Sequence, residues 1–264
     1  MHWKRDIEVL TPLFNRGAYQ DTPELRVPSI RGMVRWWFRA LGGTADQEKE
    51  AFGGMKKFGR HLAGEVMASQ LVFRVSSARL VRAFPNPPTL MHDPRKPSPQ
   101  AAFAPGATFK LEVFTRFGDL SQELERKLEN AFEVWLLLGA LGLRANRTGG
   151  NVWPANGAVP ENASALRNRL TELGCRWPAM LTGTEVGSTL DQLRAAATDT
   201  VNGAERVFGY AHGRDRQSSV LKFKIVRLES RLRLLVLAPE QRVLDEARPL
   251  LKGHRSKPET WQPI

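Results

Sequence analysis

The segment from Pro28 to Gly43 constrains the fold more strongly than any other part of the chain, because it has the pattern of one helix with two chemically opposed faces. Pro28 favours an extended conformation in the residue before it, and Ser29 is a favourable N-cap. The glycines at 42 and 43 favour the end of the helix. Apolar side chains recur at helical spacing at Ile30, Val34, Trp37 and Leu41. The sequence therefore predicts a helix from about 29 to 41 that packs its apolar face on a sheet.

The opposite face of this predicted helix carries three arginines, Arg31, Arg35 and Arg39. They repel one another, and no acidic residue lies between them to form the usual pairs one turn away. We therefore expect an anionic partner to face them, and Trp36 beside them either stacks on a nucleic-acid base or belongs to the core. The alternatives are a solvated basic face or pairing with acids of neighbouring segments. The acids of those segments are Asp6, Glu8 and Glu24.

The net charge indicates what kind of partner the chain binds. Lysine and arginine total 39 against 27 aspartates and glutamates, which gives a formal charge of +12. Such a surplus favours a polyanion, and because the basic residues are spread through the chain, nucleic acid is favoured over a membrane surface. The single cysteine, Cys175, fits a reducing compartment. Without an apolar run of membrane-spanning length or the apolar segment of a signal peptide, the chain is expected in the cytoplasm with no membrane partner.

The order of predicted elements indicates the fold class. Strands are expected at 3–10, 67–84 and 108–117 and near 151–153, and helices at 29–41 and 121–139. The order strand, helix, strand, strand, helix, strand is that of ferredoxin-like α+β folds, which RRM-like RNA-binding modules share. We assign residues 1–154 to an N-terminal ferredoxin-like domain with a glycine-rich loop. The proline-rich stretch 84–106 is expected to be a long projecting loop.

The remaining residues, 155–264, are expected to form a second, partial ferredoxin-like half. Two polar helical patterns, at 163–173 and 188–198, are interpreted as an inserted helical pair. A basic loop at 210–219 then leads to a hairpin with arms at 220–228 and 231–238. A final helix is expected from Pro239 to about Lys252, followed by a frayed tail.

The glycine-rich segment 139–150 has a physical interpretation of its own. Glycines allow backbone N–H groups to approach phosphates closely, and Arg144 and Arg147 add charge-assisted contacts. No Gly-Lys-Ser/Thr follows and no dinucleotide-binding spacing is present, so nucleotide hydrolysis is not expected. The alternative is an ordinary helix end and turn, which would account for the glycines but not for both arginines.

Several motifs together resemble one known family. They are Thr11-Pro12-Leu13-Phe14, the stretch from Pro23 to Gly32, the aromatic helix from Trp36 to Leu41, Phe52-Gly53, the glycine-rich segment, and the stretch from Arg216 to Leu221. They are similar to those of the RAMP superfamily of type III CRISPR-Cas systems, nearest the branch of the first subunit of the type III-B (Cmr) effector complex. The resemblance implies a ferredoxin-like RAMP fold and an antiviral role at one end of a ribonucleoprotein complex. It implies crRNA, target single-stranded RNA and other Cas subunits as partners.

In that branch the subunit is not the nuclease, so the resemblance implies an RNA-binding role without catalysis. The residues predicted to bind RNA combine cations, a possible stacking ring and the loop's polar groups. They are Arg16, Arg26, Ser29, Arg31, Arg35, Trp36, Arg39, Lys56, Lys57, Arg144, Asn146, Arg147, Gly149, Arg214 and Arg216.

The histidines bear on whether the chain is an enzyme. They are scattered, without metal-ligand spacing and without partner cysteines, so neither a metal site nor a cofactor is expected. The alternative function is a metal-independent RAMP endoribonuclease that processes crRNA. In that case His212 or His61 would act as general acid or base on an RNA 2′-hydroxyl.

Overall fold

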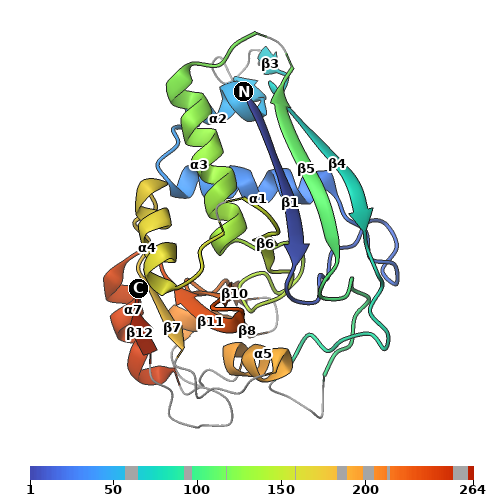
Figure 1. The fold of residues 1–264 in the computed structure, drawn as a ribbon, viewed down its shortest axis with the longest axis vertical. Helices are drawn as coiled ribbons and strands as arrows, with labels where there is room; N and C mark the ends of the chain where they lie inside the picture. Colours follow the sequence, from blue (N-terminus) through green and yellow to red (C-terminus); the bar gives the residue numbers. More distant parts are fainter. Residues whose placement is uncertain are drawn as a thin grey trace.

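The computed structural model describes residues 1–56, 65–91, 97–116, 118–157, 159–182, 189–198, 205–212, 215–251 and 261–264. Two four-stranded antiparallel sheets, each with its own helices, form two halves, the first in the upper part and the second in the lower part of Figure 1. Within the described ranges, no helix is long and apolar enough to cross a lipid bilayer.

The first half has the predicted ferredoxin-like order. Its elements are β1 (His2–Val9), α1 (Val27–Ala40), β4 (Leu71–Arg79), β5 (Thr108–Thr115), α3 (Gln122–Leu138) and β6 (Val152–Pro154). The sheet order is β4-β5-β1-β6, and neighbouring strands are antiparallel. Alternation along β5 buries Phe109, Leu111 and Val113 on one face, as the period of two predicts. This face packs with α1 and α3 in one core.

Helix α1 begins earlier than predicted. Arg26 is the N-cap residue in an extended conformation, and Pro28 lies in the first turn, where its missing N–H costs nothing. Ser29 therefore lies inside the helix rather than at its cap, and its hydroxyl donates to Asn15 Oδ1 at 3.2 Å. The predicted apolar face is confirmed, because Ile30, Val34, Trp37 and Phe38 are buried.

Three short elements follow α1, in a stretch where the sequence predicts neither a helix nor a strand. They are α2 (Ala45–Phe52) and the strands β2 (Gly54–Lys56) and β3 (Glu65–Met67), which pair antiparallel. Thr44 and Gln47 start α2 with a reciprocal capping box, in which each side chain bonds the other residue's backbone N–H.

The second half repeats the first in topology. After α4 (Ala163–Glu172) come β7 (Ala179–Thr182), α5 (Leu190–Thr198), β10 (Lys222–Leu228), β11 (Arg231–Leu237), α7 (Gln241–Ala247), the 3-10 helix η1 (Arg248–Leu250) and β12 (Trp261–Pro263). The sheet order is β10-β11-β7-β12, the same ferredoxin-like order. Between α5 and β10 lie α6 (Glu205–Phe208) and the pair β8 (Tyr210–His212) and β9 (Asp215–Gln217).

Two expectations about this half are corrected. The helices α4 and α5 are not an inserted pair, because β7 lies between them and pairs with both β11 and β12. Of the predicted frayed tail, residues 261–263 form a strand, with Pro263 opposite Met180, and residues 253–260 lie outside the described part of the chain. The four residues of β7 are all buried, so they show no alternation that would identify a strand.

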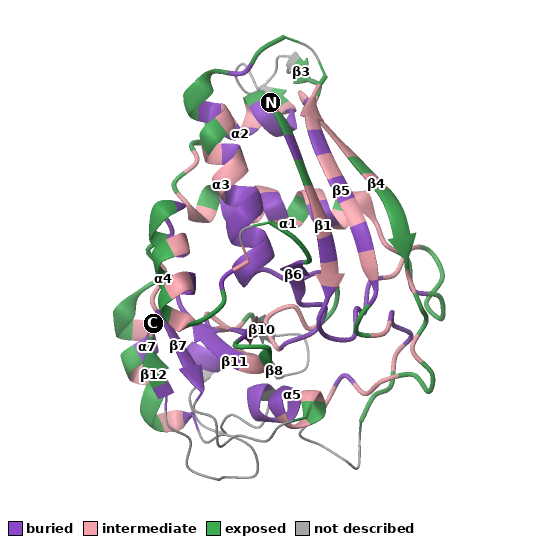
Figure 2. Cartoon of the chain, viewed as in Figure 1, coloured by how far each residue is buried: buried purple, intermediate pink, exposed green. Residues whose placement is uncertain are grey.

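The second sheet is buried on both faces. Val226 and Leu235 pack with the core of the first half, whereas Ile225 and Leu234 belong to a separate core with residues of α5 and α7. Figure 2 shows this burial in the strands at the foot of the molecule and along the lower part of α3. The two halves therefore share a continuous apolar boundary.

The proline-rich stretch does not project as expected over its described residues, 84–91 and 97–106. Phe103 forms a bridge with Leu13, and Pro88 forms one with Pro99. The buried guanidinium of Arg194, on α5, donates to the carbonyl oxygen of Pro88 at 2.6 Å. The stretch therefore lies against both halves.

Candidate nucleic-acid interface

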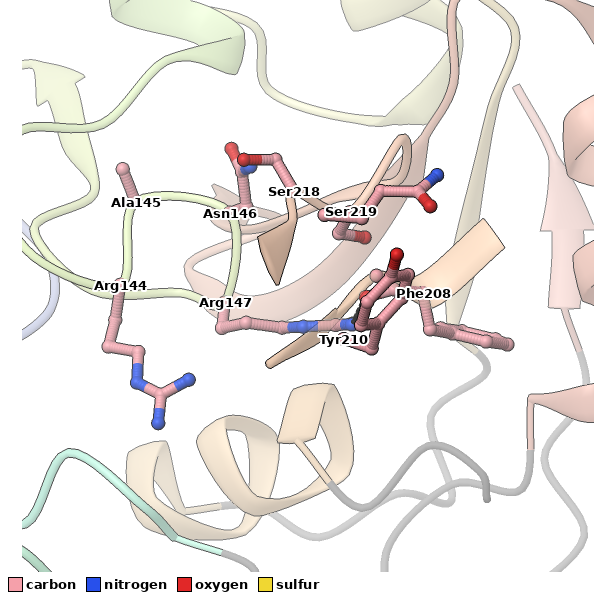
Figure 3. Close-up of a pocket in the computed structure, with 10 residues that line it drawn as sticks. Arg144, Ala145, Asn146, Arg147, Phe208, Tyr210, Ser218 and Ser219 are labelled. Carbon is pink, nitrogen blue, oxygen red and sulfur yellow. Dashed lines mark hydrogen bonds between the residues drawn. The ribbon is translucent and has the colours of Figure 1, made fainter. Parts of the chain in front are cut away.

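Two adjoining pockets open where the glycine-rich loop of the first half meets the stretch before β10. We call the first, of about 580 Å³, the loop pocket (Figure 3), and the second, of about 760 Å³, the tryptophan pocket. The loop pocket is lined by Arg144, Ala145, Asn146, Arg147, Phe208, Gly209, Tyr210, Gln217, Ser218 and Ser219. The tryptophan pocket is lined by Trp36, Arg39, Ala40, Asn146, Trp177, Ser218, Ser219, Val220, Lys222, Pro239 and Glu240. Because three residues line both, we treat the two pockets as one groove.

The glycines of the loop serve its own packing. A Cβ at Gly142 would lie 2.4 Å from the carbonyl oxygen of Phe14, and one at Gly150 would lie 2.0 Å from that of Leu141. Both residues also have positive φ, at +79° and +60°. The buried Gly149 donates its N–H to the Arg144 carbonyl oxygen at 2.9 Å, so this amide is engaged inside the loop. The part of the loop that lines the groove is residues 144–147.

The loop is bonded to the second half through β10. Thr148 N–H donates to the Phe223 carbonyl oxygen at 3.2 Å, and Phe223 N–H donates to that of Asn146 at 3.1 Å. The loop thus pairs with the edge of the second sheet, in a parallel bridge between Arg147 and Phe223. This pairing places residues of both halves around the loop pocket.

Arg147 and Arg144 differ in what they can offer a ligand. The Arg147 guanidinium donates to the Phe208 carbonyl oxygen at 2.8 Å and lies 4.8 Å from the ring centre of Phe223. Burial, and secondarily the charge of Arg144, lowers the pKa of Arg147 to about 10. Arg144 is half-buried, and its side chain points away from that of Arg147 (Figure 3). Arg147 therefore holds the pocket together, whereas Arg144 is placed to attract an anion.

The tryptophan pocket combines a ring cluster with one lysine. The rings of Trp36 and Trp177 are 5.6 Å apart and nearly perpendicular, and Trp37 lies behind both. The Lys222 ammonium is 4.2 Å from the Trp36 ring centre and donates to Asn146 Oδ1 at 2.8 Å. Burial lowers the pKa of Lys222 to about 8. Among the described residues this amide is the one acceptor within reach, so two of the three N–H donors remain for a ligand.

All three arginines of the α1 face have a partner inside the protein, although a single carboxylate offsets only one of their charges. The buried Glu48, on α2, accepts from Arg35 Nε and lies 3.0 Å from Arg39, while Arg31 donates to the Phe52 carbonyl oxygen. Internal pairing was one of the alternatives considered, but with other acids. Of those, Glu8 binds Arg227 through two bonds of 2.5 and 2.6 Å and Asp6 lies 3.6 Å from Lys110. Of the three arginines, Arg39 lines the groove.

The other predicted contacts lie elsewhere or outside the described residues. Arg16 donates to the Gln20 carbonyl oxygen and Arg26 to that of Arg16, in the loop before α1. Lys57, His61 and Arg214 lie outside the described residues, and of Lys56, His212 and Arg216 the structure describes the backbone. Across the part of the chain that the structure describes, no group of three His, Cys, Asp or Glu residues is placed to hold a metal ion.

Several residues of the groove were absent from the sequence prediction. Trp177 and Lys222 lie far from Trp36 in the chain, and no local pattern links them. The two serines, Ser218 and Ser219, lie in the stretch that carried the family resemblance, which was the signal available for them.

Comparison with known proteins gives one family match and two short sequence matches. The model of the RAMP superfamily matches residues 6–153, which is more than half of the chain. The Cmr subunit Cmr1-2 of Pyrococcus furiosus is 55% identical over 38 residues, 14% of this chain and 20% of that protein. Cmr1-1 of the same organism is 38% identical over 63 residues, 20% of this chain and 16% of that protein. The aligned segments thus span a fifth or less of these curated relatives.

The fold is also similar to solved structures. Apo Cmr1 from Pyrococcus furiosus matches with a TM-score of 0.63 at 15% identity, covering 90% of this chain and 87% of that one. A chain of the type III-B Cmr-beta complex bound to cognate target RNA matches with a TM-score of 0.52 at 11% identity, covering 89% and 93%. At these identities the likeness concerns the fold.

Proposed function

The chain belongs to the RAMP superfamily, as its motifs predicted, and on that premise we propose that it is an RNA-binding subunit of a type III-B CRISPR effector complex. In this role it contacts crRNA, target RNA or both, beside other Cas subunits, in antiviral defence. The short matches to Cmr1 subunits support the choice of complex. A structural neighbour described as bound to cognate target RNA supports RNA as the ligand.

The observation that carries the proposal is the composition of the groove between the halves. Cations, aromatic rings and short polar side chains line it together, which is the combination that binds single-stranded nucleic acid. The net charge of +12 adds long-range attraction for a polyanion.

The described lining also supports a binding role over a catalytic one. Its charged side chains are arginines, one lysine and one carboxylate, Glu240. Such groups bind and orient a phosphate backbone, and the described lining of the two pockets holds neither a histidine nor a pair of carboxylates. The ribonuclease alternative depends on His61 or His212 and is tested by the state of the RNA after binding.

The test is RNA affinity across a salt series, for the wild type and for the double variant Arg39→Ala/Arg144→Ala. For single strands the log–log slope is about −0.7 per neutralised phosphate, so losing two contacts flattens it by up to about 1.4. The matched control is Arg126→Ala/Arg231→Ala, which removes the same charge from exposed positions outside the groove.

Three results are informative. A flatter slope in the groove variant alone, with intact RNA, supports the proposal. Equal slopes in the two double variants contradict the proposal, because they would mean that RNA binding depends only on the net charge of the protein and not on the groove. RNA that is cut in EDTA, and left whole by His212→Ala or His61→Ala, would assign the chain to the ribonuclease alternative.

A further inference from the structure

We propose that the groove binds one nucleotide in a fixed orientation, with its unstacked base in the tryptophan pocket against Trp177 and its phosphate in the loop pocket at Arg144. This inference rests on the proposed function, which says that the groove binds RNA, and adds which part of a nucleotide each pocket holds.

The two pockets differ in chemistry, and the difference suits a phosphate in one and a base in the other. The loop pocket is lined by two arginines, hydroxyl groups and the amides Asn146 and Gln217, with no carboxylate among its described residues. The tryptophan pocket has two indoles, Ala40, Val220 and Pro239, and it contains Glu240. A carboxylate repels a phosphate but accepts hydrogen bonds from the N–H groups of a base. The tryptophan pocket therefore suits a base, and the loop pocket suits a phosphate.

The pockets are close enough to take two parts of the same nucleotide. Asn146, Ser218 and Ser219 line both of them. Figure 3 shows the side chains of Asn146 and Ser218 next to each other, at the end of the loop pocket opposite Arg144. Their amide and hydroxyl groups lie at the junction, where the ribose of a bound nucleotide would pass.

The ring geometry selects Trp177 as the stacking surface. One face of Trp36 is covered by the Lys222 ammonium, 4.2 Å from the ring centre. Trp177 is partly buried, lines the pocket, and is held by ring contacts to Trp36 at 5.6 Å and Trp37 at 5.3 Å. A ring fixed in this way loses little freedom when a base stacks on it. The remaining donors of Lys222 then face acceptor atoms on the edge of the base.

The test compares a short single-stranded RNA, about six nucleotides long to limit sliding, with copies that lack one base at a time. A base stacked on an aromatic side chain contributes about 1–3 kcal/mol, so one abasic position should weaken wild-type binding by about 5- to 150-fold. Trp177→Ala should bind the intact RNA more weakly by a similar factor. It should also be insensitive to loss of that same base, because the two changes remove one shared contact.

Two further variants make the result specific. Trp177→Phe keeps a stacking ring and should recover most of the affinity, which separates stacking from misfolding. Tyr19→Ala removes an exposed aromatic ring outside both pockets and should change nothing.

The failure of this inference differs from that of the proposed function. If the wild type binds RNA but Trp177→Ala loses no affinity, or retains the abasic effect at every position, the base site is overturned and RNA binding stands. If the wild type shows no binding that depends on the groove arginines, the proposed function fails first and the base site with it.

Discussion

Lys222 holds a positive charge in the tryptophan pocket, and that charge is sensitive to pH. Because burial lowers its pKa to about 8, the ammonium is mostly protonated at pH 7 and mostly neutral at pH 9. We expect RNA affinity at constant salt to fall as the pH rises through about 8. If bound RNA raises the pKa of Lys222, the affinity falls by up to about tenfold for each unit of that increase, because the protonated form then binds RNA more tightly than the neutral form. Fluorescence anisotropy with a labelled RNA at a series of pH values measures it.

Two substitutions identify Lys222 as the source of this effect. Lys222→Arg keeps its charge throughout the range and should flatten the pH profile while retaining affinity. Lys222→Met should bind weakly at every pH. A wild-type slope that survives in both variants would mean that another group titrates.

The same pKa shift predicts the opposite trend for stability. Lys222 has its ordinary pKa near 10.5 in the unfolded chain and about 8 in the folded protein. Between these values the unfolded state binds more protons, so the contribution of Lys222 to the free energy of unfolding rises with pH. Urea unfolding of wild type and Lys222→Met at pH 8 and pH 10 should show the wild type gaining stability relative to the variant at the higher pH.

Helix α2 contributes Glu48, the carboxylate that pairs with Arg35 and Arg39 of α1. Glu48→Gln keeps the shape of the side chain and one acceptor oxygen but removes the negative charge that Arg35 and Arg39 share. Because both arginines are partly exposed, we expect a loss of about 1–2 kcal/mol in the free energy of unfolding. Glu50→Gln, at an exposed position of the same helix, is the control and should change it little. Equal losses in both variants would mean that pairing with Arg35 and Arg39 contributes nothing to the free energy of unfolding.

The elements differ in how well local sequence predicts them. The amphipathic helix α1 and the alternating strand β5 follow their periodic patterns, and both were predicted within a few residues. Helix α2 was missed because eight mostly polar residues show little periodicity, although the Thr44 and Gln47 capping box was available as a signal. Strand β7 was missed because its four residues are buried on both faces.

The groove was harder to predict than the elements that build it. Arg39 and Arg144 could be selected for their charge and their neighbours in sequence. Trp177 and Lys222 join them through the docking of one half on the other, which no local pattern encodes. Conversely, the sequence predicted Arg35 as an RNA contact because its partner Glu48 lies on α2, a helix that the sequence did not predict.

The two halves are joined along β10, and Lys224 lies almost fully buried at this boundary. Its ammonium donates to three carbonyl oxygens of the first half, those of Leu136, Gly139 and Val152, at 2.6–2.8 Å. Two of these oxygens belong to the C-terminal end of α3, where carbonyls lack partners within the helix. On the same strand, Ile225 N–H donates to Asn151 Oδ1 at 2.7 Å.

Lys224→Met should therefore weaken the attachment of the second half more than it disturbs either half alone. It keeps the length of the chain in the core but leaves three buried carbonyls unpaired, and we expect a loss of about 2–4 kcal/mol in the free energy of unfolding. Five of the seven tryptophans lie in the first half, so tryptophan fluorescence follows mainly that half, whereas circular dichroism follows both. If Lys224 couples the halves, the two signals should coincide in the wild type and separate in the variant. Coincident transitions in the variant, with its stability unchanged, would mean that the shared apolar boundary joins the halves without this lysine.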